Sequence, residues 1–394
     1  MNNLFDRFIH FSNTFYSMFD IKSKVKDDRK SPQIPPSAVF LSLSALVLFK
    51  KRSFLQIDQF MRTEQAKRFI GRDKKVGKNK KVAISDSTIS RSLMTYHLQP
   101  LRRYLKTIYN KACHNGKCNV EVHGRKFRLA CADGSMFGNF YGSVLQSLGE
   151  VNLLLDIEET TTKGKELPAT RTLLNRAFSE YGKGFVDIFL LDALYADQHT
   201  INLILANNSH VLIKTKEKRL TIIQDADSLF RVCETHDYVK HITGFDSNRL
   251  CEYEIWYCDS FSFPGVDKTM NVAHIKESYV KTGKREDFWV LCTDESLTGE
   301  QLRELGHMRW RIENNGFKQL NAQSNCDHVY THDVHSFIAL MLLIFICWNL
   351  LLLFNQEETG TGYGEAKWTL DFLSSLLLSS FCVNYESFNY QTLS

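Results

Sequence analysis

Residues 337–354 form an apolar run, FIALMLLIFICWNLLLLF, in which Asn349 is the single strongly polar residue. About 18 apolar residues are enough for a membrane-spanning helix, and they equally suit a helix buried on all sides in a large domain. The flanks HDVH at 332–335 and QEE at 356–358 carry no Lys or Arg cluster of the kind that orients a membrane span. We therefore predict a buried core helix in which Asn349 finds a hydrogen-bond partner, with a membrane-anchored protein as the alternative.

Charge is distributed very unevenly along the 394 residues, although the net charge is only +5. Residues 1–130 hold 27 Lys and Arg against 9 Asp and Glu, a net charge of +18, whereas residues 131–394 carry −13. A basic front suggests a polyanionic partner, and an acidic rear suggests metal-binding carboxylates. The length predicts two or more domains. With 43% hydrophobic residues and 6 Pro, the composition excludes a collagen-like or wholly disordered chain.

The ten cysteines are scattered, and Asp6 and Asp20 interrupt the start of the chain where a signal peptide needs an apolar core. A reducing, cytoplasmic location is therefore expected. Cys113 and Cys118, in CHNGKC, are the one closely spaced pair. Free thiols beside a glycine turn are the favoured interpretation. Half of a zinc site is the alternative, disfavoured because no second Cys or His pair follows at zinc-finger spacing.

The front of the chain has helical patterns. Two helices are predicted over residues 33–70, the first an apolar run after Pro35-Pro36 and the second with a period near 3.6 residues. A basic, glycine-punctuated loop, GRDKKVGKNKK, follows at 71–81. Residues 85–112 then predict a short capped helix that stops near Pro100 and a second, basic helix.

Two helices beside a basic loop suit a helix-turn-helix, in which residues at the start of one helix reach base edges and basic residues hold phosphates. The alternative is a solvated helical bundle with lysine-rich loops. The local charge of +18 favours DNA binding. The side chains that would read the bases are Ser87, Thr88, Ser90 and Arg91.

From Glu121 the pattern changes to short apolar strands. One ends at Asp133, the next is VNLLLDIEE, and a third covers 185–191 and ends at Asp192. A helix at about 196–207 and the strand HVLIKTK follow, an order that predicts a mixed α/β sheet. Residues 217–285 have little helical period and predict a β-rich insertion. EDFWVLCTD is then a buried strand, and a helix with a capping box follows it.

Three acids stand out by position. Asp133 and Asp192 each follow an apolar strand, and Glu313 lies on a predicted amphipathic helix. Carboxylates at neighbouring strand ends can converge, and they then repel one another unless a cation lies among them. Oxygen ligands of this kind select Mg²⁺ or Mn²⁺, and two such ions can assist displacement at a phosphodiester. Taken singly, the three acids could be a turn residue, a helix cap and a partner of Arg309.

Three segments carry a family resemblance. DGS at 133–135, LLDALYAD at 190–197 and RWRIENNGF at 309–317 resemble the acidic motifs of bacterial insertion-sequence transposases of the DDE, RNase H-like superfamily. The resemblance covers about residues 120–355. It implies an α/β fold, an RNase H-like mixed sheet flanked by helices, with a β-rich insertion and an N-terminal helical domain. The implied divisions are a basic helical DNA-binding region at 1–120, a discontinuous catalytic core at 121–216 and 286–355, the insertion at 217–285 and a C-terminal segment at 356–394.

The resemblance makes Asp133, Asp192 and Glu313 the catalytic metal ligands, and it implies two Mg²⁺ or Mn²⁺ ions. Arg309 would hold a phosphate near them. Gly306 and Leu320 stand where this group has its usual Tyr and Lys, with His307 and Lys318 as the nearest substitutes. Lys214, Lys216, Lys218 and Arg219 would face the DNA backbone, or else form a solvated strand end. The expected DNA-binding residues are Arg309, Lys318, Lys214, Lys216, Arg91 and Ser87.

The implied function is that of a DNA transposase of an insertion sequence, which binds the element ends and catalyses metal-dependent strand cleavage and strand transfer. The expected partners are element-end and target DNA, with a homodimer in the synaptic complex and no membrane, and the expected location is the nucleoid in the cytoplasm. The alternative is a catalytically degenerate, transposase-derived DNA-binding protein.

Overall fold

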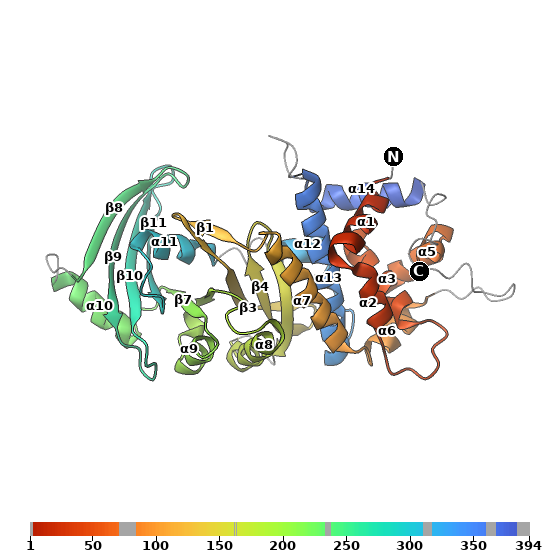
Figure 1. Ribbon diagram of the computed structural model, residues 1–394, viewed down its shortest axis with the longest axis horizontal. Coiled ribbons are helices and arrows are strands. Elements are labelled where there is room, and N and C mark those ends of the chain that lie inside the picture. Colours follow the sequence, from red (N-terminus) through yellow and green to blue (C-terminus); the bar gives the residue numbers. More distant parts are fainter. Residues whose placement is uncertain are drawn as a thin grey trace.

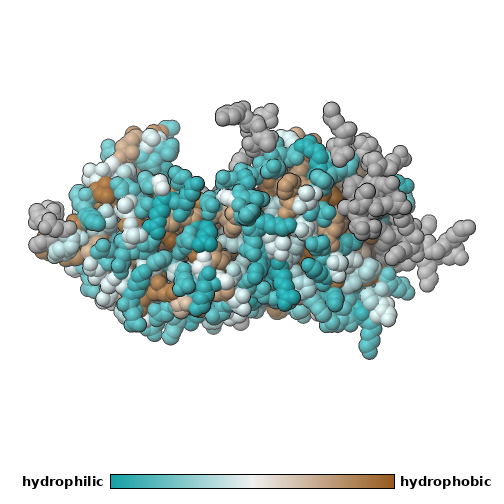
Figure 2. Space-filling view, viewed as in Figure 1, coloured by the Kyte–Doolittle hydropathy of each residue, from teal (hydrophilic) through white to brown (hydrophobic). Residues whose placement is uncertain are grey.

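The computed structural model describes residues 3–70, 84–160, 162, 164–232, 238–309, 317–359 and 368–383. The molecule is elongated (Figure 1). A long sheet fills its left and central parts, and a bundle built from both the start and the end of the chain forms the right part. In the face shown by Figure 2 the outline is hollowed between these two ends, and hydrophilic side chains cover most of the surface.

The front of the chain is helical, as predicted. Its helices are α1 (Leu4–Tyr16), α2 (Met18–Lys24), α3 (Pro36–Leu48), α4 (Phe54–Met61), α5 (Glu64–Phe69), α6 (Asp86–Leu93) and α7 (Leu98–His114). Residues 33–70 hold three helices instead of the two predicted, because Thr63 caps a new helix with its side chain. The predicted stop near Pro100 is also wrong. Pro100 lies in the first turn of α7, where its missing N–H removes no helical hydrogen bond.

Within the described residues, nine strands form one mixed sheet in the order β5-β4-β3-β6-β7-β11-β10-β9-β8. Strands β3, β6 and β7 are mutually parallel and every other neighbouring pair is antiparallel. Strands β1 (Val120–Val122) and β2 (Arg125–Phe127) form a separate hairpin. The sheet strands are β3 (Leu129–Phe137), β4 (Phe140–Leu148), β5 (Leu153–Thr160), β6 (Ile188–Asp192), β7 (His210–Thr215), β8 (Lys240–Asp246), β9 (Cys251–Phe261), β10 (Met270–Tyr279) and β11 (Arg285–Cys292). The predicted RNase H-like mixed sheet is confirmed.

Helices flank this sheet. Besides α7, those that contact its strands are α8 (Glu166–Tyr181), the short 3-10 turn η1 (Ala193–Tyr195), α9 (Gln198–Leu205), α10 (Thr221–Val232), α11 (Gly299–Met308) and α13 (Val334–Thr359), whereas α12 (Lys318–Ser324) and α14 (Leu370–Val383) pack mainly against other helices. Helix α11 begins with the predicted capping box of Thr298 and Gln301. The segment predicted to be β-rich with little helical period contains α10, whose apolar side chains pack against β9 and β10.

Strands β8 to β11 extend the central sheet, because β11 pairs with β7. A row of stacked rings crosses these four strands at one register. His241 stacks on Trp256 at 4.6 Å between ring centroids, and His274 stacks on Trp289 at 4.1 Å. Strands β8 to β11 therefore lie in the same layer as β3 and β6, the strands that carry Asp133 and Asp192.

Helix α13 contains the apolar run, and its burial confirms the predicted core helix. Within the described part of the chain it is the one helix long and apolar enough to cross a membrane, with 89% of its most apolar window buried inside the protein. It packs against β5, α7 and α3. Helices α1 and α14 lie beside it, so the front and the rear of the chain share one helical body (Figure 1).

Candidate functional site: an acid pair on adjacent parallel strands

The sheet register brings Asp133 and Asp192 side by side. Strands β3 and β6 are parallel, with Cys131 opposite Leu190, and each aspartate follows two residues later. Asp192 ends β6 as predicted. Asp133 lies in the middle of β3, contrary to the prediction, because this strand continues past β6 to pair with β4 as far as Phe137.

One oxygen of each carboxylate is held by the local backbone. Asp133 Oδ1 accepts from the Gly134 N–H at 2.8 Å, and Asp192 Oδ1 accepts from the Leu194 N–H at 2.9 Å. The other oxygen of each, Oδ2, accepts from the same atom, Nη2 of Arg309, at 3.3 Å in both cases. The two Oδ2 atoms can therefore be no farther apart than twice that distance.

Arg309 follows the last residue of α11 and is 11% exposed. Its guanidinium neutralises part of the repulsion between two half-buried carboxylates. The phosphate-holding role expected from the resemblance would require this side chain to leave the acid pair. The two carboxylates thus already converge on one cationic group, the guanidinium of Arg309.

The chemistry of these donors fits a divalent cation. Carboxylate oxygens are the preferred ligands of Mg²⁺ and Mn²⁺, and the Oδ2 atoms point to one place. Glu313, the predicted third ligand, lies outside the described residues. Among the residues that are described, no group of three His, Cys, Asp or Glu side chains is spaced to hold a metal ion.

Lys214 lies opposite Asp192 on the next parallel strand, at the edge of the site. It was expected to face the DNA backbone, but it is only 9% exposed, with Nζ 3.8 Å from the centre of the Phe288 ring. Burial lowers the pKa of Lys214 to about 8, although Glu286 and Glu277 oppose this shift. Lys216, two residues later, is exposed.

The expected substitutes around the third motif have different surroundings. His307 Nε2 lies 2.8 Å from Glu277 Oε1, so this ring belongs to a buried ionic cluster. Leu320 is buried, and Lys318 is exposed in the first turn of α12. Lys318 is therefore the more accessible of the two predicted substitutes.

Among the predicted base readers, Ser87 and Arg91 lie on the exposed face of α6, while Thr88 and Ser90 are half-buried. Ser85 caps this helix by accepting from the Thr88 N–H at 3.2 Å. The basic loop at 71–81 lies outside the described residues.

Neither Cys113 nor Cys118 forms a disulfide bond. Cys118 is buried at the end of the turn that follows α7, and its thiol lies 3.9 Å from the Tyr109 carbonyl oxygen.

Tyr195, within the motif LLDALYAD, was not predicted to belong to the site. It is buried, and its hydroxyl lies 3.2 Å from Thr170 Oγ1 on α8. Burial raises the pKa of Tyr195, and the charges of Asp133, Asp192 and Glu166 raise it further. The sequence around Tyr195 does not indicate that this residue lies near the site, because its contact with Thr170 depends on how α8 packs.

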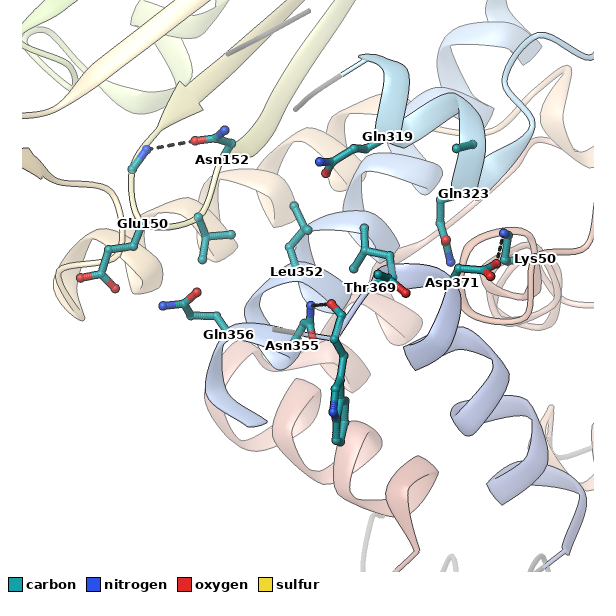
Figure 3. A pocket seen from close by; sticks show the side chains of 15 residues that line it. Lys50, Glu150, Asn152, Gln319, Gln323, Leu352, Asn355, Gln356, Thr369 and Asp371 are labelled. Carbon is teal, nitrogen blue, oxygen red and sulfur yellow. Dashed lines mark hydrogen bonds and ion pairs between the residues drawn. The ribbon is translucent and has the colours of Figure 1, made fainter. Parts of the chain in front are cut away.

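A cleft of about 650 Å³ lies elsewhere, between the β4–β5 connection and the helical body. Figure 3 shows amide side chains from α12 and α13 pointing into it, with Lys50 and Asp371 paired at one side. Its lining contains neither Asp133, Asp192 nor Arg309. The acid pair is therefore a separate feature of the molecule.

Comparisons with known proteins found a matching family model and similar solved structures. The family model described as a transposase DDE domain matches residues 122–350, which include both aspartates and Arg309. No curated protein matches the chain. Among solved structures, one described as the cryo-EM structure of the piggyBac transposase synaptic complex with hairpin DNA is similar with a TM-score of 0.45 and 8% identity, over 96% of this chain and 81% of that chain. Because the family model spans more than half of its length, the chain belongs to the family of proteins with a transposase DDE domain.

Proposed function

We propose that this protein is the DNA transposase of a bacterial insertion sequence, which binds the element ends and catalyses strand cleavage and strand transfer. The observation that carries the proposal is the convergence of Asp133 and Asp192 on one cationic group at adjacent parallel strands. Membership of the transposase DDE domain family supports it. Glu313 is proposed as the third acid, four residues after Arg309 in the sequence.

Asp133, Asp192 and Glu313 would hold two Mg²⁺ or Mn²⁺ ions. When bound, such ions activate a water or hydroxyl group and stabilise the leaving oxygen of an in-line phosphodiester displacement. The chain's own contribution is to position the two aspartates. Backbone N–H groups fix one oxygen of each carboxylate, and Arg309 limits their repulsion until a cation binds.

The proposed DNA contacts are electrostatic. Arg91 and Ser87 are exposed on α6, and Lys216 and Lys318 are also exposed. Lys214 lies opposite Asp192, and Arg309 contacts both aspartates. The proposed partners are element-end and target DNA, held by a homodimer in the synaptic complex. The proposed location is the nucleoid in the cytoplasm.

Cleavage of duplex DNA carrying the terminal inverted repeats that flank the gene tests this function. Asp133→Asn, Asp192→Asn and Glu313→Gln should each slow Mg²⁺-dependent cleavage by at least about 100-fold, equivalent to roughly 3 kcal/mol, while leaving end binding intact. Asp225→Asn, at an exposed position on α10, is the matched control and should cleave normally. End binding by the wild-type protein without any cleavage would favour the degenerate DNA-binding protein.

The salt dependence of end binding tests the contacts. Neutralisation of about 5 phosphates predicts a slope of log K against log[salt] of about −4 to −5. Arg91→Ala should make this slope shallower by about 1, whereas Lys183→Ala, at an exposed lysine in the turn after α8, should leave it unchanged. An unchanged slope for Arg91→Ala would remove this residue from the DNA contacts.

A further inference from the structure

Glu166 is a buried glutamate that the sequence motifs do not include. It is the first residue of α8 and is only 7% exposed. Its Oε2 atom is buried, and no donor among the described residues hydrogen-bonds to it. Burying a carboxylate oxygen without a hydrogen-bond partner is costly, which suggests that Glu166 is kept for a function.

Gly134, the residue after Asp133, makes room for this glutamate. A Cβ atom at Gly134 would lie 2.6 Å from Glu166 Cγ and 3.0 Å from Glu166 Oε1. The backbone of Gly134 has no positive φ, so its conformation does not require glycine. Glycine is therefore needed at this position for space, because the lack of a side chain lets the carboxylate of Glu166 pass beside the strand that carries Asp133.

Tyr195 lies within electrostatic reach of both Glu166 and the acid pair. Its hydroxyl lies 3.2 Å from Thr170, which is one helical turn after Glu166 on α8. After burial, the causes that raise the pKa of this hydroxyl include the charges of Asp133, Asp192 and Glu166. One phenol therefore lies within electrostatic reach of all three carboxylates.

We infer that Glu166 is a further carboxylate of the acid pair, which helps Asp133 and Asp192 to bind a divalent cation. This inference rests on the proposed function. The Oε2 atom of Glu166, which accepts no hydrogen bond from the described residues, is available as a ligand, and a cation would relieve the repulsion between this buried acid and the two half-buried aspartates. Arg309 bonds both aspartates in this structure, so cation binding would displace its guanidinium and draw Glu166 toward them.

Calorimetric titration of the full-length protein with Mn²⁺ alone, without DNA, tests this inference. Glu166→Gln keeps the shape of the side chain and should weaken Mn²⁺ binding by at least about tenfold. Its melting temperature without Mn²⁺ should equal or exceed that of the wild type, because a buried charge is removed. Glu180→Gln, later on the same helix, is the matched control and should bind Mn²⁺ normally. Wild-type Mn²⁺ affinity in Glu166→Gln would overturn the inference.

Asp133→Asn, measured alongside, separates this inference from the proposed function. Loss of Mn²⁺ binding in Asp133→Asn with full binding in Glu166→Gln refutes the role of Glu166 and leaves the proposed function standing. A wild-type protein that binds no Mn²⁺ refutes the proposed cation chemistry, and the role of Glu166 fails with it.

Gly134→Ala provides an independent test, because its added Cβ would push Glu166 aside. It should weaken Mn²⁺ binding about as much as Glu166→Gln does. The double variant should be no weaker than either single variant, since both changes remove the same ligand. Additive losses would mean that the Cβ acts on Asp133 directly, and this would contradict the proposed contact.

Discussion

Asn349 forms two hydrogen bonds with the backbone of Leu154. Its Oδ1 accepts from the Leu154 N–H at 2.9 Å, and its Nδ2 donates to the Leu154 carbonyl oxygen at 2.8 Å. Leu154 lies on β5, one of the two edge strands of the sheet, and no other strand among the residues that the structure describes pairs with its outward backbone groups. The single polar residue of the apolar run therefore satisfies a buried sheet edge, where unpaired groups would be costly.

Asn349→Leu should destabilise the protein markedly. The change leaves both backbone groups of Leu154 buried without partners, and each costs about 1 to 3 kcal/mol, so the free energy of unfolding should fall by roughly 2 to 6 kcal/mol. Urea denaturation followed by circular dichroism measures this change. Asn248→Ala, at an exposed turn position, is the control. A loss below about 1 kcal/mol in Asn349→Leu would contradict the role of this hydrogen-bonded pair.

A charge in the centre of α13 should be even less tolerated. Leu342 is fully buried, so Leu342→Asp places a carboxylate in an apolar environment, at a cost of roughly 3 to 5 kcal/mol out of a usual 5 to 15. We expect the variant to aggregate or to be degraded during expression. Leu55→Asp makes the same substitution at an exposed leucine and should yield soluble protein. Normal solubility and melting of Leu342→Asp would argue against a buried α13.

Elements with strong local signals were predictable from the sequence. The apolar run, the capping box at Thr298 and the strand ending at Asp192 all appear where their patterns placed them. Such signals depend on near neighbours in the chain, which is why they can be read without the fold. The same holds for the order of strands that implied a mixed sheet.

Features that depend on distant packing were not predictable in this way. Asp133 lies inside a strand because β4 pairs with the residues that follow it, and this pairing has no local signature. Glu166 begins α8, a helix that was not predicted from the sequence, and an acid in the first turn of a helix is ordinary because the helix dipole favours it. Its importance depends on Gly134, 32 positions earlier, and on Tyr195, 29 positions later.

The Glu277 cluster joins α11 to the sheet extension and should give stability a specific pH dependence. Glu277 Oε1 accepts from Arg303 Nε at 2.5 Å and lies 2.8 Å from His307 Nε2, while Oε2 accepts from the Tyr279 hydroxyl at 2.9 Å. Burial alone would raise the pKa of Glu277, but His307, Arg303 and Tyr279 outweigh it and lower this pKa to about 2. The carboxylate therefore stabilises the fold above its unfolded pKa of about 4.5.

This contribution should be lost as the pH falls from about 4.5 to 2, with a slope of at most about 1.4 kcal/mol per pH unit. Glu277→Gln should be less stable than the wild type at pH 7, and the difference between them should shrink on going to pH 3. Urea midpoints at both pH values measure the difference. Glu252→Gln, at an exposed position on β9, should show no such convergence. A difference that stayed constant with pH would refute the lowered pKa.

The last prediction concerns Arg309, which bonds both aspartates through one nitrogen. Arg309→Gln leaves two neighbouring carboxylates without this charge, so the protein without divalent cation should lose about 1 to 3 kcal/mol of stability. A cation would no longer have to displace the guanidinium. We therefore expect Arg309→Gln to bind Mn²⁺ more tightly than the wild type in the absence of DNA, and Mn²⁺ to restore its melting temperature.

Arg171→Gln separates this effect from a general loss of ion pairing. Arg171, on α8, pairs at 2.6 Å with Asp197, the N-cap residue of α9. Its removal should also lower the melting temperature, but Mn²⁺ should not restore it, because no cation site is vacated there. Calorimetric Mn²⁺ titration and thermal melts of both variants provide the comparison. Mn²⁺ affinity of Arg309→Gln at or below the wild-type value would mean that the guanidinium and the cation do not compete for the two aspartates.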